Sequence, residues 1–500
     1  MNNHIPLLKD VQRRPENVLV NVTPNETRVA ILEDETLCEI HIERYSGHGL
    51  VGNIYLGVVR RVLPGMQSAF IDIGLERAAF LHIVDIMEQR QKPDQPQRIE
   101  HTLFEGQSIL VQVIKDPINT KGARLSTQIS LAGRFLVYLP QDNHIGISQR
   151  IDNEEERNQL RERLDKLLPA NTNHGYIIRT SAENATDEEL RADIAYLTRR
   201  WEEIQHSART KAAGTLLYQD LPLSLRVLRD MYSDNINQVW VDSEASYKHM
   251  QQFANHYAQD AADKLVLFQG TQSLFETYHV EKQINEALQP RVNLSFGGYL
   301  IIEATEAMTT IDVNTGGFVG ARNFDETIFK TNLEACQVIA REIRLRNLGG
   351  IIIIDFIDMM NEEHRQAVLQ ELVRTLSFDR TRVTLNGFTS LGLVELTRKR
   401  TRENLNQVLC EPCPHCHGLG LLKTPQTICY EIMREIIREN KKTPNISFRI
   451  LAAPVVIDRF LTEEANSLER LSQAINQSIA LVVESSYNQD QYDVVGIHLE

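Results

Sequence analysis

The chain has 500 residues, of which 42% are apolar and 24% charged, and its formal net charge is −14. This length exceeds what one ordinary core organises and predicts roughly two to five domains. The sequence contains no apolar run near the roughly 20 residues that span a bilayer, and its start lacks the basic and apolar regions of a secretory signal. Six cysteines give no disulfide framework, so we expect a cytoplasmic protein without membrane contact. The net negative charge excludes a surface that is positively charged throughout, but it is compatible with local stripes of basic residues that bind nucleic acid.

The first 45 residues contain three short apolar runs, which we interpret as strands. A Pro-Asn-Glu turn at residues 24–26 separates the first two as a hairpin. This segment is too short to bury a core alone, and the apolar run at residues 264–268 could complete its sheet. Residues 1–45 and 224–288 would then form one discontinuous domain that is interrupted by an insertion.

The segment 46–130 has a different pattern, in which glycines separate five short strand candidates. These candidates are residues 53–62, 67–73, 78–83, 108–114 and 123–130. Such a pattern is typical of a small OB-type barrel, a common binder of single strands. Phe70 and Phe80 lie on predicted strands, and Lys115 and Lys121 follow another. Aromatic rings on a barrel face can stack on unpaired bases while lysines neutralise phosphates, although both rings could instead belong to the core.

Residues 131–223 combine charged helices with an apolar strand at 175–181. The strand runs into Arg179 and Thr180, followed by a serine. This ending could present a guanidinium and hydroxyls to a phosphate. The alternative is an ordinary solvated strand end, which the segment taken alone favours.

Two apolar runs within residues 289–409 each end in an aspartate. The first reaches Asp312, and the second consists of four consecutive isoleucines that lead into Asp355. A helical pattern at residues 325–346 lies between them, so the two strand ends should meet at one edge of an α/β sheet, where ligands bind. Four isoleucines in a row predict a strand that is buried on both faces.

Two carboxylates that meet at a strand edge are costly unless a cation joins them. Oxygen ligands of this kind favour Mg²⁺, which commonly takes one or two carboxylates together with water and substrate phosphate. Asn314 lies two residues beyond Asp312 and so points to the same side of an extended chain, where it could orient the carboxylate or an attacking water. The alternative is that Asp312 and Asp355 merely cap strand-to-loop turns. We interpret Asp358 as structural.

A Cys-Pro-His-Cys string from Cys413 to Cys416 is typical of a zinc knuckle, in which two thiolates bind one tetrahedral ion. The sequence has no second CxxC. The other ligands would be Cys410, His415 or His417, or the same knuckle of a second subunit. A redox CxxC would need a thioredoxin-like strand and helix beside it, which the sequence lacks.

Taken together, these features resemble the bacterial ribonuclease E/G family over essentially the whole chain. The strings behind the resemblance are Gly-Asn-Ile-Tyr at 52–55, Ala-Thr-Glu-Ala at 304–307, Thr-Asn-Leu-Glu-Ala at 331–335, Ile-Asp-Phe-Ile-Asp-Met at 354–359 and Cys-Pro-His-Cys at 413–416. The absence of a long Pro- and Arg-rich tail makes the chain most similar to the ribonuclease G branch.

The resemblance implies a multi-domain fold of α/β and β parts. We expect an S1/OB barrel at 46–130 inserted in an RNase H-like subdomain at 1–45 and 224–288, and a 5′-sensor region at 131–223. A DNase I-like catalytic α/β domain at 289–409, a zinc link at 410–423 and a small C-terminal α/β domain at 424–500 would follow.

The resemblance also implies a function. The chain would be a Mg²⁺-dependent RNA endonuclease that is specific for single strands and prefers 5′-monophosphorylated substrates. It would leave 5′-phosphate and 3′-hydroxyl ends, in the 5′ maturation of rRNA precursors and in mRNA turnover. The rivals are a non-catalytic, zinc-linked RNA-binding scaffold and a metal-dependent phosphodiesterase that acts on DNA or small phosphate esters.

Residue roles are assigned by position in the resemblance. Asp312 and Asp355 would bind Mg²⁺ with the assistance of Asn314; RNA would contact Phe70, Phe80, Lys115 and Lys121; Arg179 and Thr180 would sense the 5′-phosphate; Cys413 and Cys416 would bind zinc. The zinc would be shared between two subunits of a homodimer, with a homotetramer as the further assembly. An intrachain zinc site that includes Cys410 or His417 remains the alternative.

Overall fold

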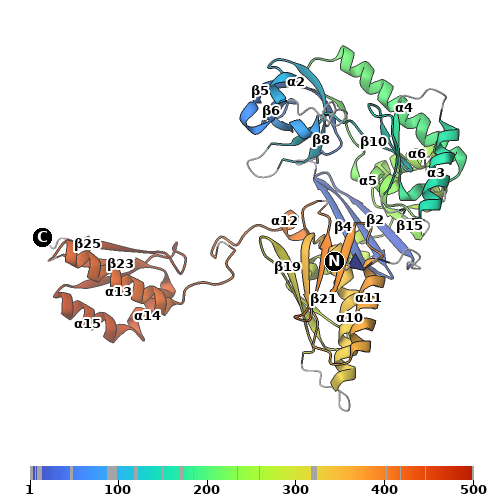
Figure 1. Cartoon of the computed structure of the whole chain (residues 1–500). Helices are drawn as coiled ribbons and strands as arrows, with labels where there is room; N and C mark the ends of the chain where they lie inside the picture. Colours follow the sequence, from blue (N-terminus) through green and yellow to red (C-terminus); the bar gives the residue numbers. More distant parts are fainter. Residues whose placement is uncertain are drawn as a thin grey trace. The chain divides into compact units, whose positions relative to one another are not determined.

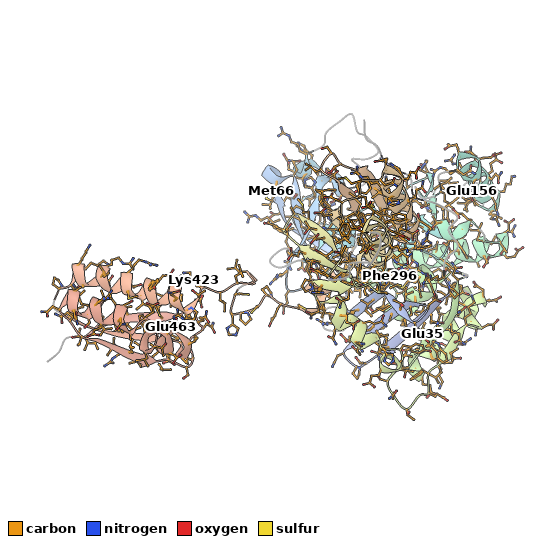
Figure 2. All side chains as sticks on the ribbon, turned by 90° about the horizontal axis from the view of Figure 1, so that it is seen from below. Glu35, Met66, Glu156, Phe296, Lys423 and Glu463 are labelled. Atoms are coloured by element: carbon orange, nitrogen blue, oxygen red, sulfur yellow. The ribbon has the colours of Figure 1, made fainter. Side chains whose placement is uncertain are left out.

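The computed structural model describes residues 4–5, 7, 14–44, 49–86, 98–117, 122–148, 151, 153–168, 174–183, 185–233, 235–257, 259–316, 324–400, 402–416, 418–444 and 446–497. Lys121 and His417 lie outside these described residues. The chain divides into two units, Met1–Leu405 and Asn406–Glu500. Figure 1 shows their helices and strands, and Figure 2 shows the side chains, with Met66 marking the barrel described below.

A five-stranded sheet combines the N-terminal strands with two later ones, in the order β16-β15-β2-β3-β4. Its strands are β2 (Glu16–Val22), β3 (Glu26–Glu33), β4 (Thr36–Arg44), β15 (Ile236–Val241) and β16 (Leu265–Leu267). The first three form an antiparallel meander, while β15 runs parallel to β2 and β16 parallel to β15. The prediction that residues 264–268 complete the N-terminal sheet is therefore confirmed. The helix α6 (Glu244–Tyr257) joins β15 to this last strand.

The predicted barrel is present as five strands in a closed ring. The strands are β5 (Ile54–Leu63), β6 (Ser68–Asp72), β7 (Ala79–His82), β8 (Ser108–Lys115) and β9 (Arg124–Ser126). Their order is β5-β6-β7-β9-β8, and pairing of β5 with β8 closes the ring, as expected for an OB- or S1-like fold. A further strand, β14 (Thr215–Tyr218), pairs with β5 from outside.

A four-stranded sheet with two long helices follows the barrel. Its order is β10 (Leu131–Ala132), β11 (Leu136–Leu139), β13 (Gly175–Ile178) and β12 (Ile145–Ile147), with α3 (Glu154–Leu167) and α4 (Asp187–Thr210) beside it. A capping box of Thr186 and Glu189 starts α4, because the two side chains satisfy the first free N–H groups of the helix. The short helix α2 (Ile99–Thr102) lies between the barrel strands β7 and β8. Four more short helices follow β14 along the chain: α5 (Leu223–Arg226), α7 (Gln259–Ala262), α8 (Leu274–Thr277) and α9 (Val280–Ala287).

A seven-stranded sheet holds the two aspartates. Its order is β1 (His4–Ile5), β21 (Val383–Phe388), β22 (Leu393–Arg398), β20 (Gly350–Asp355), β19 (Met308–Asn314), β18 (Tyr299–Ala304) and β17 (Arg291–Asn293). Within it, β19 and β20 are parallel, and the other pairings are antiparallel. The helices α10 (Phe324–Leu345) and α11 (Glu362–Leu376) lie along one side of the sheet (Figure 1).

The prediction that the isoleucine strand is buried on both faces is wrong. Ile352 and Ile354 are fully buried in the core that α10 and α11 form with the sheet, whereas Ile351 is 46% exposed on the other face and Ile353 is half-buried. Both long helices pack on the same face, so alternate residues of β20 face away from them. The isoleucine run reflects the β-propensity of branched side chains rather than two buried faces.

The second unit is a small α/β module around a three-stranded sheet in the order β24 (Ile479–Val483), β23 (Ser447–Ala452), β25 (Tyr492–Ile497). Its helices are α13 (Pro425–Lys442), α14 (Pro454–Leu461) and α15 (Ala465–Ile475). Ile432, Phe448 and Phe460 are central to its core. A short helix, α12 (Leu405–Leu409), stands at the boundary between the units. In the described part of the chain, no helix combines the length and apolarity needed to cross a bilayer.

Candidate functional site

Asp312 and Asp355 lie side by side on neighbouring strands. They are register partners in the parallel pair β19–β20, near the ends of both strands. Ile311, Val313 and Ile354 point into the core, so the alternation of a strand turns the two carboxylates to the opposite, open face, where both are exposed. The predicted meeting of the two strand ends is therefore confirmed.

Asn314 belongs to the same group of side chains. Its amide Nδ2 donates a hydrogen bond to Asp312 Oδ2 at 2.8 Å, as the two-residue spacing predicts. This bond fixes the rotamer of Asp312 and leaves its other carboxylate oxygen available. With Asp312 oriented in this way and Asp355 beside it, the two carboxylates could hold a divalent cation.

Repulsion between neighbouring carboxylates disfavours the ionised form of Asp355. The pKa of Asp355 is raised above its ordinary value, first by partial burial and then by the negative charges of Asp312 and Asp358. A cation bound between the aspartates would remove this penalty. Among the described residues no three His, Cys, Asp or Glu side chains cluster closely enough to form a complete metal site by themselves. Other ligands of such a cation would have to come from water or substrate.

Two further side chains on this face were not predicted from the sequence. Tyr299 on β18 is the register partner of Asn314, and the guanidinium of Arg291 on β17 lies 3.9 Å from the centre of its ring. An aromatic ring and a cation therefore flank the carboxylates. Their position depends on how β17 and β18 pair with β19, and a motif search along the sequence does not reveal that register.

On the barrel, Phe70 and Phe80 face outward. They are cross-strand partners on β6 and β7, with ring centroids 6.3 Å apart at an interplanar angle of 67°, and Phe70 is 37% exposed while Phe80 is half-buried. The alternative that both rings belong to the core is therefore wrong. His82 extends the aromatic surface, with its ring 6.4 Å from that of Phe80.

Cations lie at both ends of this aromatic pair. The register across the barrel reads Arg61, Phe70, Phe80, Arg124 and Lys115, on five successive strands. Lys115 is exposed, as its predicted role requires, whereas Arg124 is paired with Asp85 at 2.8 Å. Arg61 and Arg124 were not predicted from the sequence, because their place beside the two rings depends on the register of β5 with β6 and of β9 with β7. Lys121 lies outside the described residues.

Arg179 follows β13 and is held by two acceptors. Its Nη1 donates to the carbonyl oxygen of Gly133 at 2.5 Å, and its Nη2 donates to Asp230 Oδ1 at 2.8 Å. The side chain is 27% exposed, so it is neither buried nor freely solvated. Thr180 begins a 3-10 turn directly after it and is half-buried. Gly133 and Asp230 were not found from the sequence, because both lie far from Arg179 along the chain.

The cysteine pair lies in the second unit. Cys413 is exposed and Cys416 is half-buried, and the backbone N–H of Gly420 donates to Cys416 Sγ at 3.3 Å. Hydrogen bonds from the backbone N–H groups of Cys416 and His415 lower the pKa of the Cys413 thiol. His415 Nδ1 lies 2.8 Å from Asn488 Oδ1. This turn stabilises the thiolate of Cys413, which is the form that binds a metal. Cys410 is exposed, and His417 lies outside the described residues.

Comparisons with known proteins agree over most of the chain. Residues 130–401 match the model of the Ribonuclease E/G family. Ribonuclease G of Haemophilus influenzae is 50% identical over 486 residues, which cover 96% of this chain and 99% of that protein. Ribonuclease G of Escherichia coli strain K12 is 49% identical over 487 residues, with the same coverage. Ribonuclease E of Nostoc is 40% identical over 395 residues, which cover 78% of this chain and 57% of that protein.

Proposed function

Because the chain belongs to the ribonuclease E/G family, we propose that it is a Mg²⁺-dependent endonuclease that cuts single-stranded RNA and prefers 5′-monophosphorylated ends. Membership of the family makes the chain an endoribonuclease with a role in RNA processing. The metal, the strand specificity and the end preference are the proposal. The observation that supports it most is that Asp312 and Asp355 lie in register on parallel strands, with Asp312 oriented by Asn314.

The donor set fits Mg²⁺, which takes one or two carboxylates and completes its octahedron with water and substrate phosphate. When bound, the ion would supply positive charge to the scissile phosphate and lower the pKa of a water for in-line attack. Asp312 and Asp355 would hold the ion, and Asn314 would keep Asp312 in its ligating rotamer. Cleavage of this kind leaves 5′-phosphate and 3′-hydroxyl ends.

The open face of the sheet suits an unpaired strand. Asp312 and Asp355 are exposed on the same sheet face as Ile351, so a single strand can approach the carboxylates. Tyr299 and Arg291 would contact the nucleotides next to the scissile bond. We assign the cellular roles to the 5′ maturation of rRNA precursors and to mRNA turnover in the cytoplasm. The scaffold rival requires that the aspartate pair be dispensable.

Strand binding is assigned to the outward face of the barrel. Stacking of one base on an aromatic side chain contributes about 1–3 kcal/mol, so we expect Phe70→Ala to weaken binding of a short unpaired RNA about tenfold, measured by fluorescence anisotropy. Phe104→Ala is the matched control, because Phe104 is an exposed aromatic of the same segment that lies outside the register row. Equal affinity of the Phe70 variant and wild type would contradict this assignment.

The preference for 5′-monophosphorylated ends is assigned to Arg179 and Thr180. A guanidinium that donates to a phosphate contributes about 1.5–3 kcal/mol, so Arg179→Ala should lower the ratio of cleavage rates on 5′-monophosphorylated and 5′-hydroxyl RNA about tenfold. A triphosphate end, being bulkier, should be cut more slowly than a monophosphate end. Arg163→Ala is the control, since Arg163 is an ion-paired arginine of the same region. The assignment fails if the ratio is the same in wild type and the Arg179 variant.

A further inference from the structure

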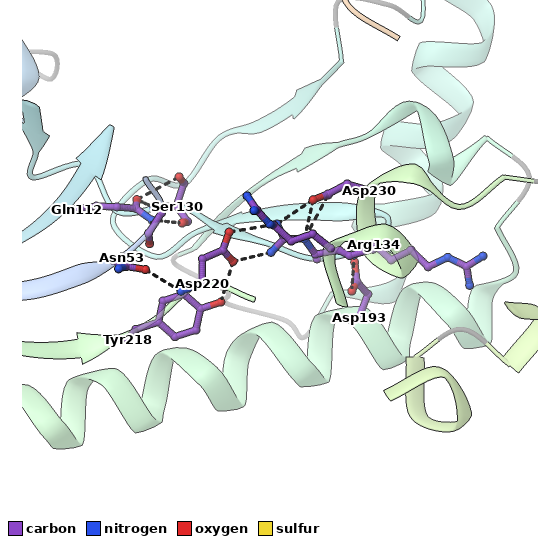
Figure 3. Close-up of polar contacts among 12 residues, drawn as sticks. Asn53, Gln112, Ser130, Arg134, Asp193, Tyr218, Asp220 and Asp230 are labelled. Atoms are coloured by element: carbon purple, nitrogen blue, oxygen red, sulfur yellow. Dashed lines mark hydrogen bonds and ion pairs between the residues drawn. The ribbon is translucent and has the colours of Figure 1, made fainter. Parts of the chain in front are cut away.

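Asp230 lies between two guanidinium groups (Figure 3). On one side its Oδ1 accepts from Arg179 Nη2 at 2.8 Å. On the other side Arg229 Nη2 donates to its Oδ2 at 2.9 Å, and Arg229 Nε lies 3.2 Å from both carboxylate oxygens. A carboxylate in this position fixes the direction of the Arg179 side chain.

Arg229 is itself held by a second carboxylate. Its side chain is only 7% exposed, and it donates in bidentate fashion to Asp220, with Nη1 2.7 Å from Oδ1 and Nη2 3.2 Å from Oδ2. The backbone N–H of Asp220 in turn donates to Asn53 Oδ1 at 2.9 Å, at the start of the barrel strand β5. Charges therefore alternate from Arg179 through Asp230 and Arg229 to Asp220.

The local backbone is unusual at this point. Arg229 and Asp230 belong to a π-helical turn, Val227–Met231, which directly follows α5. Such turns are rare, and they are frequent at functional sites because they redirect side chains. Here the turn lets Arg229 donate to its own neighbour in sequence while Asp230 also accepts from Arg179.

The second acceptor of Arg179 is also fixed. Asp193 on α4 accepts the backbone N–H groups of Arg134, Phe135 and Leu136, at 3.1, 3.0 and 2.9 Å, and so holds the turn that contains Gly133. A Cβ at Gly133 would collide with the Asp193 carboxylate oxygens, so a larger residue there would displace the carboxylate that holds this turn. The carbonyl of Gly133 is thus presented to Arg179 from a rigid turn.

We propose that Asp230 is a positioning residue of the 5′-phosphate site, which orients Arg179 for the terminal phosphate. This inference rests on the proposed role of Arg179. Asp230 and the Gly133 carbonyl occupy two of the five N–H groups of the guanidinium and leave three for a phosphate. Pre-organisation of this kind reduces the entropy that binding costs.

Arg229 explains why Asp230 does not simply cancel the charge of Arg179. Burial alone would raise the pKa of Asp230, but the positive charges of Arg229 and Arg179 lower it below its ordinary value, so the carboxylate is ionised at neutral pH. Because Arg229 takes most of the contacts of the Asp230 carboxylate, Asp230 holds Arg179 through a single hydrogen bond and leaves its remaining N–H groups to a phosphate. A carboxylate paired with Arg179 alone would compete with the substrate instead.

The test is the ratio of cleavage rates on 5′-monophosphorylated and 5′-hydroxyl forms of one RNA, measured with the full chain. We expect Asp230→Ala to lower this ratio at least threefold and to leave the rate on 5′-hydroxyl RNA within twofold of wild type. The isosteric Asp230→Asn keeps the shape without the charge and should lower the ratio at least twofold. Asp187→Ala is the matched control, since it removes an Asp–Arg pair of the same region that does not touch Arg179.

The double variant Arg179→Ala with Asp230→Ala separates the two roles. If Asp230 acts through Arg179, the ratio of the double variant equals that of Arg179→Ala alone. An unchanged ratio in Asp230→Asn, or a higher one in Asp230→Ala, would overturn the inference, and the higher ratio would make Asp230 a competitor of the phosphate. If Arg179→Ala itself leaves the ratio unchanged, the proposed 5′-phosphate site is wrong. If Arg179→Ala lowers the ratio but the Asp230 variants leave it unchanged, only the positioning role of Asp230 is wrong.

Discussion

Replacement of Asp355 by asparagine is expected to lower the cleavage rate of single-stranded RNA about a thousandfold, with strand binding unchanged. The variant keeps the shape of the side chain but removes one of two charges that face each other across β19 and β20. Charge stabilisation by a bound metal supplies several kcal/mol, and a loss of about 4 kcal/mol corresponds to about a thousandfold in rate. Asp312→Asn should behave in the same way.

The fold should tolerate this substitution. Asp355 is exposed on the open face, and its buried neighbours Ile354 and Phe356 are unchanged, so the melting temperature should stay near that of wild type. The measurement is the single-turnover rate over a Mg²⁺ titration, together with affinity for an uncleaved strand. The wild-type protein should lose cleavage activity in EDTA and regain it when Mg²⁺ is added.

Asp358→Asn is the matched control, because Asp358 is an exposed carboxylate three residues further along, in the loop that follows β20. We expect it to retain most of the activity, with a small effect through the electrostatics of Asp355. An Asp355 variant that still cuts RNA at the wild-type rate in Mg²⁺ would remove the metal site from the proposal. Unchanged function in that variant is also what the scaffold rival predicts.

The aspartate pair was predictable because its signal is local. Each strand is a β-branched run that ends in an aspartate, and the intervening helix fixes a parallel pairing, which brings the two ends together. The two-residue spacing likewise predicts the contact of Asn314 with Asp312. The open face of β20 was not predictable in the same way, because burial depends on where α10 and α11 pack and not on the composition of the strand.

The barrel illustrates an intermediate case. Five short strands with glycine corners predicted the closed ring, but the same sequence left Phe70 and Phe80 between core and surface. The register of the strands decides whether the rings lie in the core or on the surface, and the two rings pair across β6 and β7 on the outward side. Arg61 and Arg124 join them only through pairings with other strands.

The partners of Arg179 had no signal that sequence alone could provide. Gly133 lies well before Arg179 in the sequence and Asp230 lies well after it. The contact with Gly133 depends on the turn that Asp193 holds, and the contact with Asp230 depends on the π-helical turn. A carboxylate that follows an arginine in a helix is usually interpreted as an exposed pair. The pair of Arg229 and Asp230 differs from such exposed pairs because Arg229 is buried.

If two copies of the chain share one zinc ion, as we propose, Cys413→Ser should convert the resulting dimer to monomers. Among the described residues the knuckle of one chain presents two thiols, in a turn whose amides favour the Cys413 thiolate, and tetrahedral zinc requires four ligands. We propose that a second copy of the chain supplies the other two. Zinc then contributes directly to association, because neither half-site binds the ion well alone.

Sedimentation velocity and zinc analysis measure this effect together. Wild type should sediment as a dimer or a larger even assembly with one zinc per two chains, and either chelation or Cys413→Ser should release monomers without zinc. Cys410→Ser is the matched control, since Cys410 is an exposed cysteine three residues before the knuckle. It should retain both the zinc and the dimer, because the shared site needs only Cys413 and Cys416 from each chain. One zinc per chain, lost in the Cys410 variant, would instead establish an intrachain site, and an unchanged dimer in Cys413→Ser would rule out the shared ion.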